Sequence, residues 1–229
     1  MNKTISVLFA TTIFTAPVLA DQLRVVVDIP PVHGIVEGVL GSNASITTLI
    51  SRGIDPHNYT MKPRHAAALS EADLIVLIGE SLTPSLAEKL PSLVSNAQII
   101  ELAEVSNVHL IAYEDAHEDH EDDAHHDDDH HENHADEKEQ NEHEHDEHHD
   151  DEHDIHDHSG INPHMWLDID NADVWAHAIA KSASELSTAL TSDINANLAA
   201  FEQALIGLKS EMQTLTAKPY SVSHDAFGY

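Results

Sequence analysis

The sequence contains no cysteine and little positive charge. Without cysteine there is no disulfide, no thiolate metal ligand and no cysteine nucleophile, so any tight transition-metal site must use histidine and carboxylate. Only 10 residues are lysine or arginine against 41 acidic residues, which gives a formal net charge of −31. Nucleic acid and anionic membrane surfaces are therefore poor partners, and cations are better ones.

Long apolar runs are also scarce, and the longest one lies at the N-terminus. Residues 5–19 are mostly apolar, follow Lys3, contain Pro17 and lead to the small residue Ala20. This order is typical of a secretory signal peptide, and the run is too short and broken to span a bilayer. The pattern predicts cleavage after Ala20 and export to a periplasm. No cysteine stands at the cleavage point to take a lipid anchor, so we expect a soluble protein without a membrane anchor.

Most of the negative charge lies in one stretch, Glu114 to His158. It holds 23 acidic residues, a single base (Lys138) and 14 of the 21 histidines. Its apolar content is too low to offset the entropy of ordering, which predicts a disordered loop.

Histidines and carboxylates a few residues apart suit borderline cations such as Zn²⁺. On a flexible loop such sites are expected to be many, weak and exchangeable. The alternative is a solvated acidic linker, for which acids alone would suffice. The candidate ligands are His117, His120, His125, His126, His130, His131, His134, His143, His145, His148, His149, His153, His156 and His158.

Outside this stretch, apolar β-branched runs alternate with helical patterns. Strands are predicted over residues 23–28, 46–50, 74–78 and 97–102, and helices over 32–40, 63–72 and 83–90. This alternation predicts an α/β fold with a mostly parallel sheet. In such sheets ligands bind beyond the carboxyl ends of the strands, where the loops after Asp28, Ile50 and Ile78 are expected to gather.

After the acidic stretch, the pattern predicts two helices and the start of a new strand. The helices cover residues 171–186 and 194–215, with Thr191 to Asp193 as the cap of the second, and the strand covers 220–223. The second helix carries an apolar stripe at Leu198, Phe201, Leu205, Leu208, Met212 and Leu215. A second lobe needs about 100 residues, so the few that follow Pro219 predict that most of such a lobe is absent from this chain.

Three histidines outside the acidic stretch share a context. His57 lies in a Gly-Ile-Asp-Pro-His loop after a predicted strand, His164 in an Asn-Pro-His turn before a helix, and His224 at the end of a predicted strand. A proline precedes His57 and His164, and it restricts the backbone there, so that the histidine that follows is held rigidly as a ligand. These three side chains could converge on one cation, although their spacing carries no local metal signature and each could be an ordinary turn residue.

The remaining histidines are weaker candidates. His65 and His177 lie within predicted helices and are expected at the surface or at the edge of the core, and His109 carries no motif. His33 follows the first strand and is a candidate for a residue that contacts and orients the metal ligands without binding the metal itself.

Three segments together resemble a known family. They are Asp55-Pro-His-Asn-Tyr-Thr-Met-Lys-Pro63, Asn162-Pro-His-Met-Trp-Leu-Asp168 and Ser223-His-Asp-Ala-Phe-Gly-Tyr229. They look like the three metal-ligand motifs of the cluster A-I periplasmic metal-binding proteins of ABC importers. A charged His-rich loop between the first two motifs is typical of the zinc-specific, ZnuA-type members.

The resemblance implies a fold, a site and a partner. The fold is two α/β lobes joined by a long rigid helix, with Zn²⁺ bound between them by His57, His164 and His224 and delivered to an inner-membrane ABC permease. Asp225 joins His33 as a candidate support for the ligands. Members fill the fourth ligand position with a second-lobe carboxylate, water or a glutamate before the first histidine, where this chain has Pro56.

The implied domain division follows the same pattern. A signal peptide covers residues 1–20, an N-terminal lobe 21–190 interrupted by the loop at 114–158, a linking helix 191–216, and the start of a C-terminal lobe 217–229. The protein is expected to be a monomer and not an enzyme. The alternatives are a manganese or iron receptor of the same family, a zinc-buffering protein built on the acidic loop, and a zinc hydrolase with Asp55 or Asp225 as general base.

Overall fold

A four-stranded parallel sheet forms the centre of the protein, which confirms the predicted α/β class. The computed structural model describes residues 22–112, 160–216, 218–222, 224 and 226–229. The strand order is β2-β1-β3-β4, and each neighbouring pair is parallel. The strands are β1 (Leu23–Val27), β2 (Ala44–Thr48), β3 (Leu74–Leu77) and β4 (Gln98–Glu101).

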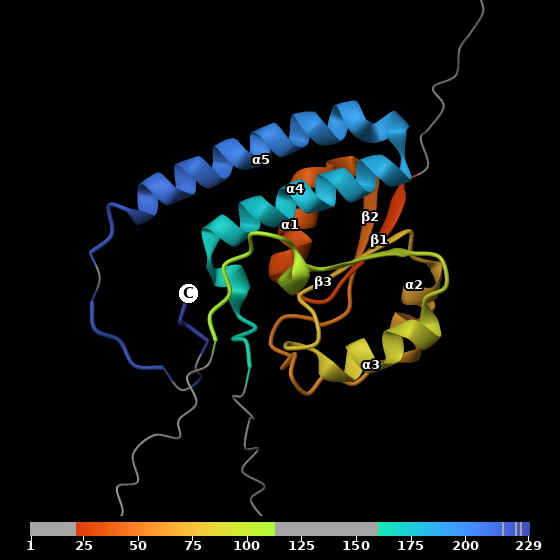
Figure 1. Ribbon diagram of the computed structural model, residues 1–229, viewed down its shortest axis with the longest axis horizontal. Helices are drawn as coiled ribbons and strands as arrows, with labels where there is room; N and C mark the ends of the chain where they lie inside the picture. The colour runs from red at the N-terminus through yellow and green to blue at the C-terminus, as the bar shows by residue number, and fades with distance from the viewer. Residues whose placement is uncertain (1–21, 113–159, 217, 223, 225) are drawn as a thin grey trace, which may run out of the picture. The chain divides into compact units, whose positions relative to one another are not determined.

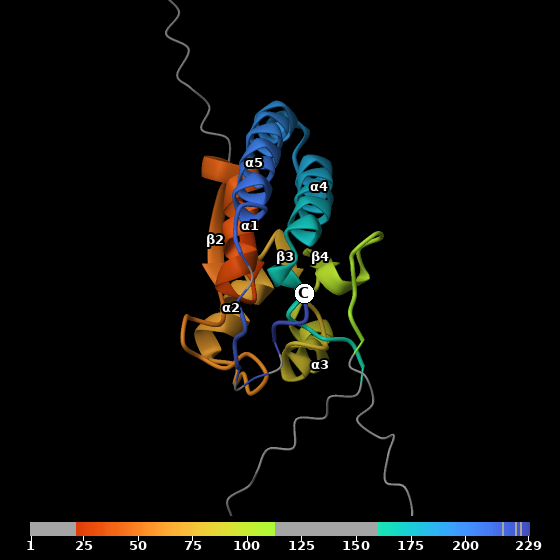
Figure 2. The same ribbon diagram turned by 90° about the vertical axis from the view of Figure 1, so that its left-hand side faces the viewer.

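The helices form layers beside the sheet. Helices α1 (Pro30–Leu40), α2 (Pro63–Glu71) and α3 (Pro84–Leu93) alternate with the strands, and each has proline in its first turn, where a missing N–H costs nothing. Helices α4 (Ile169–Leu186) and α5 (Thr191–Met212) follow later in the chain. Helices α1, α4 and α5 pack together, and α2 and α3 lie on the other side of the sheet (Figures 1 and 2).

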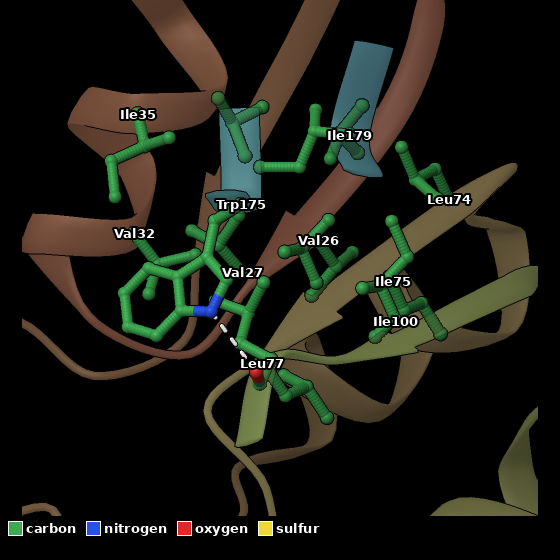
Figure 3. Close-up of a cluster of buried hydrophobic side chains, with 14 of the residues drawn as sticks. Val26, Val27, Val32, Ile35, Leu74, Ile75, Leu77, Ile100, Trp175 and Ile179 are labelled. Carbon is green, nitrogen blue, oxygen red and sulfur yellow. Dashed lines mark hydrogen bonds between the residues drawn. The ribbon is translucent and has the colours of Figure 1, made fainter. Parts of the chain in front are cut away.

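The core lies on both faces of the sheet, under α1 and α4 on one side and under α2 and α3, with Leu69 and Leu86, on the other. On the first side, Val32 of α1 and Ile179 of α4 lie near Trp175 together with buried valine from β1 (Figure 3). The Trp175 side chain is fully buried, and its indole N–H donates to the carbonyl oxygen of Leu102 at 3.0 Å. This bond satisfies the polar atom of the largest core side chain, so α4 is fixed against the end of β4.

Helix α5 runs back along α4 and starts differently from the prediction. Thr191 to Asp193 do not cap it; they form its first turn, directly after a 3₁₀ turn at Thr188–Leu190, and the N-cap is Leu190 without a side-chain bond. The 3₁₀ turn carries the chain straight into the helix, so no side-chain cap forms there. A Cβ at Gly38 of α1 would lie 2.5 Å from the Phe201 ring, so this glycine permits the close packing of α1 and α5.

The apolar stripe of α5 is only half covered. Its first part, which includes Leu198 and Leu205, packs against the core, whereas Leu208 and Met212 are each 48% exposed.

The predicted strand over 220–223 is wrong for its described part. Residues 220–222 have no regular structure, and Tyr220 is 73% exposed. A strand needs a neighbour to pair its backbone groups, and the described residues offer none there. None of the helices in the described ranges is long and apolar enough to cross a membrane.

The described residues fall into two units, the first within 22–111 and 162–229, and the second with Ala112, Gly160 and Ile161. In the second unit Ala112 and Ile161 form an antiparallel bridge, so both ends of the insertion lie next to each other. The stretch Glu114–His158 and the predicted signal peptide lie outside the described residues.

Candidate metal centre

The three histidines of the sequence motifs come together at one point. Each of His57, His164 and His224 offers a ring nitrogen, and these nitrogens all lie within 4.8 Å of one another. The ring centroids of His164 and His224 are 4.8 Å apart, and the His57 centroid lies 5.5 Å and 5.7 Å from them. A tetrahedral ion with bonds of 2.0–2.1 Å to nitrogen needs ligand nitrogens about 3.3 Å apart, so small side-chain movements suffice to surround one.

The edge of the sheet brings the loops together around Asp28. This residue follows β1, and its main-chain oxygen accepts from the N–H of Ile50 at 2.9 Å. Its carboxylate accepts from the N–H of Ile29 at 2.7 Å and of Ile78 at 2.6 Å. The predicted gathering of the loops after Asp28, Ile50 and Ile78 is thus confirmed.

Asp28 is also the one fully buried carboxyl among the described residues. Burial raises its pKa from 3.8 to about 7, although the hydrogen bonds from the N–H groups of Ile78 and Ile29 favour the charged form. From the sequence, Asp28 was predicted only as the end of a strand, because a single aspartate after an apolar run does not reveal that its carboxylate joins two strand ends.

His57 sits on a compact turn in the loop after β2. Its backbone N–H donates to Oδ1 of Asp55 at 3.0 Å, and the side-chain amide of Asn58 donates to Oδ2 of the same carboxylate at 3.0 Å. Asp55 therefore orders the turn that presents His57. His57 itself is half-buried.

Tyr59 connects this loop to α2 and α3 by hydrogen bonds. Its hydroxyl lies 2.5 Å from Nδ1 of His65 on α2, and its carbonyl oxygen accepts from the Ser85 hydroxyl on α3 at 2.7 Å. Burial raises the pKa of Tyr59 to about 12, despite the opposing charge of Arg64. His65 is buried rather than at the surface, and burial together with the charges of Arg64 and Lys62 lowers its pKa, so it is neutral at pH 7.

His164 is held by Asn162 in one tautomer. Both the backbone N–H and Nδ1 of His164 lie within hydrogen-bonding distance of Oδ1 of Asn162, at 3.0 and 2.8 Å. An amide oxygen only accepts, so Nδ1 carries the proton and Nε2 of the neutral ring carries the lone pair. That Nε2 lies 2.9 Å from Nε2 of His224, and His164 is only 4% exposed.

The segment that carries His224 is fastened by its neighbours. Ala226 is buried, and its N–H donates to the carbonyl oxygen of His224 at 2.9 Å. The Tyr229 hydroxyl donates to the carbonyl oxygen of Asn162 at 2.9 Å and accepts from the N–H of Ile111 at 3.0 Å. The third histidine is therefore tied to the turn that holds the second.

This arrangement suits capture of a borderline cation. Three imidazoles supply neutral nitrogen ligands, and Zn²⁺ takes such ligands readily. His164 is buried and His224 exposed, so an ion can enter from the side of His224. Among the described residues this group holds three side chains, which leaves the fourth position of a tetrahedral ion to solvent or to a ligand outside the group.

The other candidates from the sequence lie elsewhere or outside the described residues. Nδ1 of His33 lies 2.8 Å from the Thr48 hydroxyl at the end of β2, so its role behind the ligands stays a prediction. His109 bonds to Asp168 at 2.7 Å, and His177 lies on α4 beside Glu202. Asp225 and the 14 histidines of the acidic stretch lie outside the described residues.

Sequence reasoning missed the groups that hold the histidines in place. Asn162, Tyr59 and Tyr229 lie within the quoted motifs, but nothing in their spacing says which partner each will bond. The available signal was their position within two to five residues of a candidate histidine.

Comparisons with known proteins show which family the chain matches. Residues 25–229 match the family model ZnuA, described as "Zinc-uptake complex component A periplasmic". The chain is 42% identical to the high-affinity zinc uptake system protein ZnuA of Paracoccus denitrificans, over all of this chain and 70% of that protein. The protein of the same name from Brucella abortus (strain 2308) is 31% identical over 99% of this chain and 71% of its own length.

Solved structures show the same fold. A crystal structure of ZnuA matches with a TM-score of 0.61 at 26% identity, over 84% of this chain and 58% of that chain. A zinc-bound deletion mutant of ZnuA matches with a TM-score of 0.67 at 25% identity, over 91% of this chain and 65% of that one. The chain thus spans less than two thirds of these structures. It belongs to the ZnuA family.

Proposed function

We propose that the protein is a periplasmic zinc receptor that captures Zn²⁺ with His57, His164 and His224 and delivers it to an inner-membrane ABC permease. The observation that carries the proposal is the convergence of three imidazoles from segments 107 and 60 residues apart in the sequence. Family membership and the zinc-uptake names of the relatives support the same function.

The donor set favours zinc over manganese. Manganese prefers oxygen ligands, whereas this group offers three imidazoles. The tautomer of His164 is set in advance by Asn162, so that ligand needs no rearrangement of its proton before it binds. When the ion enters, it replaces the contact between the two Nε2 atoms of His164 and His224.

The role of Asp55 argues against hydrolysis. A zinc hydrolase needs a general base aimed at metal-bound water. Both carboxylate oxygens of Asp55 accept hydrogen bonds, from the His57 N–H and the Asn58 amide, so this residue shapes the turn. The receptor binds and releases the ion without chemistry on it.

The proposed domain division keeps the boundaries expected from the sequence. A signal peptide of residues 1–20 precedes a lobe of residues 21–190, which the loop at 114–158 interrupts. Residues 191–216 form the link, most of it α5 (Thr191–Met212), and 217–229 begin a second lobe. The exposed apolar side chains of Ile206, Leu208 and Met212 on α5 support a second lobe packed against that half of the helix.

A competition titration tests the function. The protein is mixed with a chromogenic chelator of nanomolar zinc affinity, and Zn²⁺ or Mn²⁺ is added. A receptor removes one equivalent of Zn²⁺ from the chelator and no Mn²⁺, and it turns over no ester or peptide substrate. A buffering protein would leave all the zinc with the chelator, and an enzyme would show turnover; either result contradicts the proposal. Sequencing of the exported protein should give Asp21 as its first residue.

A further inference from the structure

A second group of ligating side chains lies between helices α4 and α5. Asp173 and His177 belong to α4, and Glu202 belongs to α5. One ligand atom of each lies within 4.8 Å of the others, and Nε2 of His177 is 2.9 Å from Oε1 of Glu202. None of these residues belongs to the three motifs that carry His57, His164 and His224.

The two helices present these side chains to one another. Residues four apart lie one above the other on a helix face, so Asp173 and His177 project from the same side of α4. Helix α5 runs back beside α4 (Figures 1 and 2), which brings Glu202 to this face. The ligands therefore come from two elements separated by a turn, and they meet only when the helices pack.

Charge and space at this place suit a divalent ion. Two carboxylates balance a charge of +2, and the histidine adds a nitrogen ligand, a donor set that Zn²⁺ accepts. The nearby cation Lys209 is already paired with Asp170. Asp173 and Glu202, but not His177, line a cavity of about 330 Å³ together with Asp170 and Lys209, so water can reach the two carboxylates.

We propose that Asp173, His177 and Glu202 form a second divalent-cation site, which binds Zn²⁺ and cross-links α4 to α5. It differs from the group of three histidines because two of its three ligands are carboxylates and because its side chains remain open to solvent, with His177 55% and Glu202 35% exposed. We therefore expect weaker binding than at the three-histidine group. It also differs from sites whose ligands are all close together in the sequence, such as those expected in the stretch Glu114 to His158, because unfolding separates Glu202 from the other two ligands.

Thermal melts separate this site from the others. Zinc raises the melting temperature only through sites that bind the folded chain better than the unfolded chain, so ligands that are neighbours in sequence contribute little. All variants are made in a full chain that carries His57→Ala and His224→Ala, the double-alanine background. These two changes disable the three-histidine group without opening the core. Glu202→Gln and His177→Gln then test the second site, and Glu185→Gln on the exposed face of α4 is the matched control for a lost carboxylate. Melts in EDTA show that each variant folds.

In the double-alanine background, micromolar Zn²⁺ should still raise the melting temperature. Glu202→Gln and His177→Gln should each raise the zinc concentration needed for the same increase in melting temperature about tenfold or more. Glu185→Gln should leave that concentration unchanged. In the unmodified chain, the His177 ring signal in ¹H–¹³C NMR should shift on zinc addition. Equal zinc effects in Glu202→Gln and Glu185→Gln, no zinc effect in the background, or an unmoved His177 signal would each overturn the proposal.

Discussion

The side-chain oxygen of Asn162 accepts two hydrogen bonds from His164, one from its backbone N–H at 3.0 Å and one from Nδ1 at 2.8 Å. The first bond fixes the turn, and the second fixes the ring and its proton. The main-chain carbonyl oxygen of the same asparagine accepts a hydrogen bond from the Tyr229 hydroxyl. One residue outside the set of ligands thus positions the buried histidine directly and the His224 segment through Tyr229.

Replacing Asn162 by alanine should weaken zinc binding about 10- to 100-fold, because His164 loses the acceptor that selects its tautomer and orientation. Asn162→Asp should retain more affinity, since a carboxylate can accept both bonds. Asn96→Ala, at an exposed asparagine after α3, is the control and should bind as the parent does. Competition titration against a zinc chelator measures all three. Equal affinity of Asn162→Ala and the parent would show that the contact has no part in binding.

Tyr229→Phe should weaken zinc binding by about tenfold and speed zinc release, because the ring stays but two hydrogen bonds of roughly 1 kcal/mol each are lost. Those bonds hold the segment of His224 to Asn162 and Ile111. Tyr220→Phe removes the hydroxyl of a tyrosine that is 73% exposed and serves as the control. Stopped-flow transfer of zinc to a chelator gives the release rates, which should stay equal for both variants if the terminal segment does not position the ligand.

Replacing Glu114–His158 with a short Gly-Ser link should leave the fold and the tight site intact while lowering the number of zinc ions bound. The bridge between Ala112 and Ile161 brings the ends of the insertion together, so a short link can close the gap. Equilibrium dialysis at high zinc concentration counts the ions, and circular dichroism checks the fold. Loss of the tight site in this variant would mean that the stretch supplies one of its ligands.

Asp28 should make the metal-free protein less stable as pH rises from about 4 to 7. Its pKa is raised from 3.8 to about 7 by burial, so the folded chain holds a proton that the unfolded chain releases. The stabilisation is complete below about pH 4, falls by up to about 1.4 kcal/mol per pH unit, and is lost above about pH 7.

Asp28→Asn should remove this slope, even if the variant is less stable because its amide faces a backbone N–H. Urea unfolding in EDTA at pH 5 and pH 7 measures the difference between the two pH values for each protein. Parallel losses in parent and variant would assign the pH dependence to other groups.

The order of elements followed from local pattern because each strand is a short apolar run and each early helix begins at proline. Strand β3, Leu-Ile-Val-Leu, is buried on both faces, and its composition alone identifies it. The errors lie where neighbours decide. Residues 220–222 have a sequence suited to a strand but no partner among the described residues, and the start of α5 is set by the 3₁₀ turn before it.

The three histidines were predicted as one ligand set because their segments resemble the motifs of a known family; the turns alone left their convergence open. The groups that hold them were not predicted. Asp28 joins the end of β1 to β3 across 50 residues, and Tyr59 pairs with His65 through packing of the loop on α2. The second cluster was missed for a similar reason. Asp173 and His177 read as an ordinary polar helix face until α5 brings Glu202 to it.

The most direct test of the central claim is the zinc affinity of the full chain after each of His57→Ala, His164→Ala and His224→Ala, measured by competition with a nanomolar chelator. Each change should lower the affinity about 100-fold or more, because each removes one ligand from a single site. His177→Ala, at an exposed histidine of α4 outside this group, should leave the affinity of this tight site unchanged. Retention of the parent's affinity by any of the three variants, with its fold intact, would contradict the assignment of the three histidines to one zinc ion.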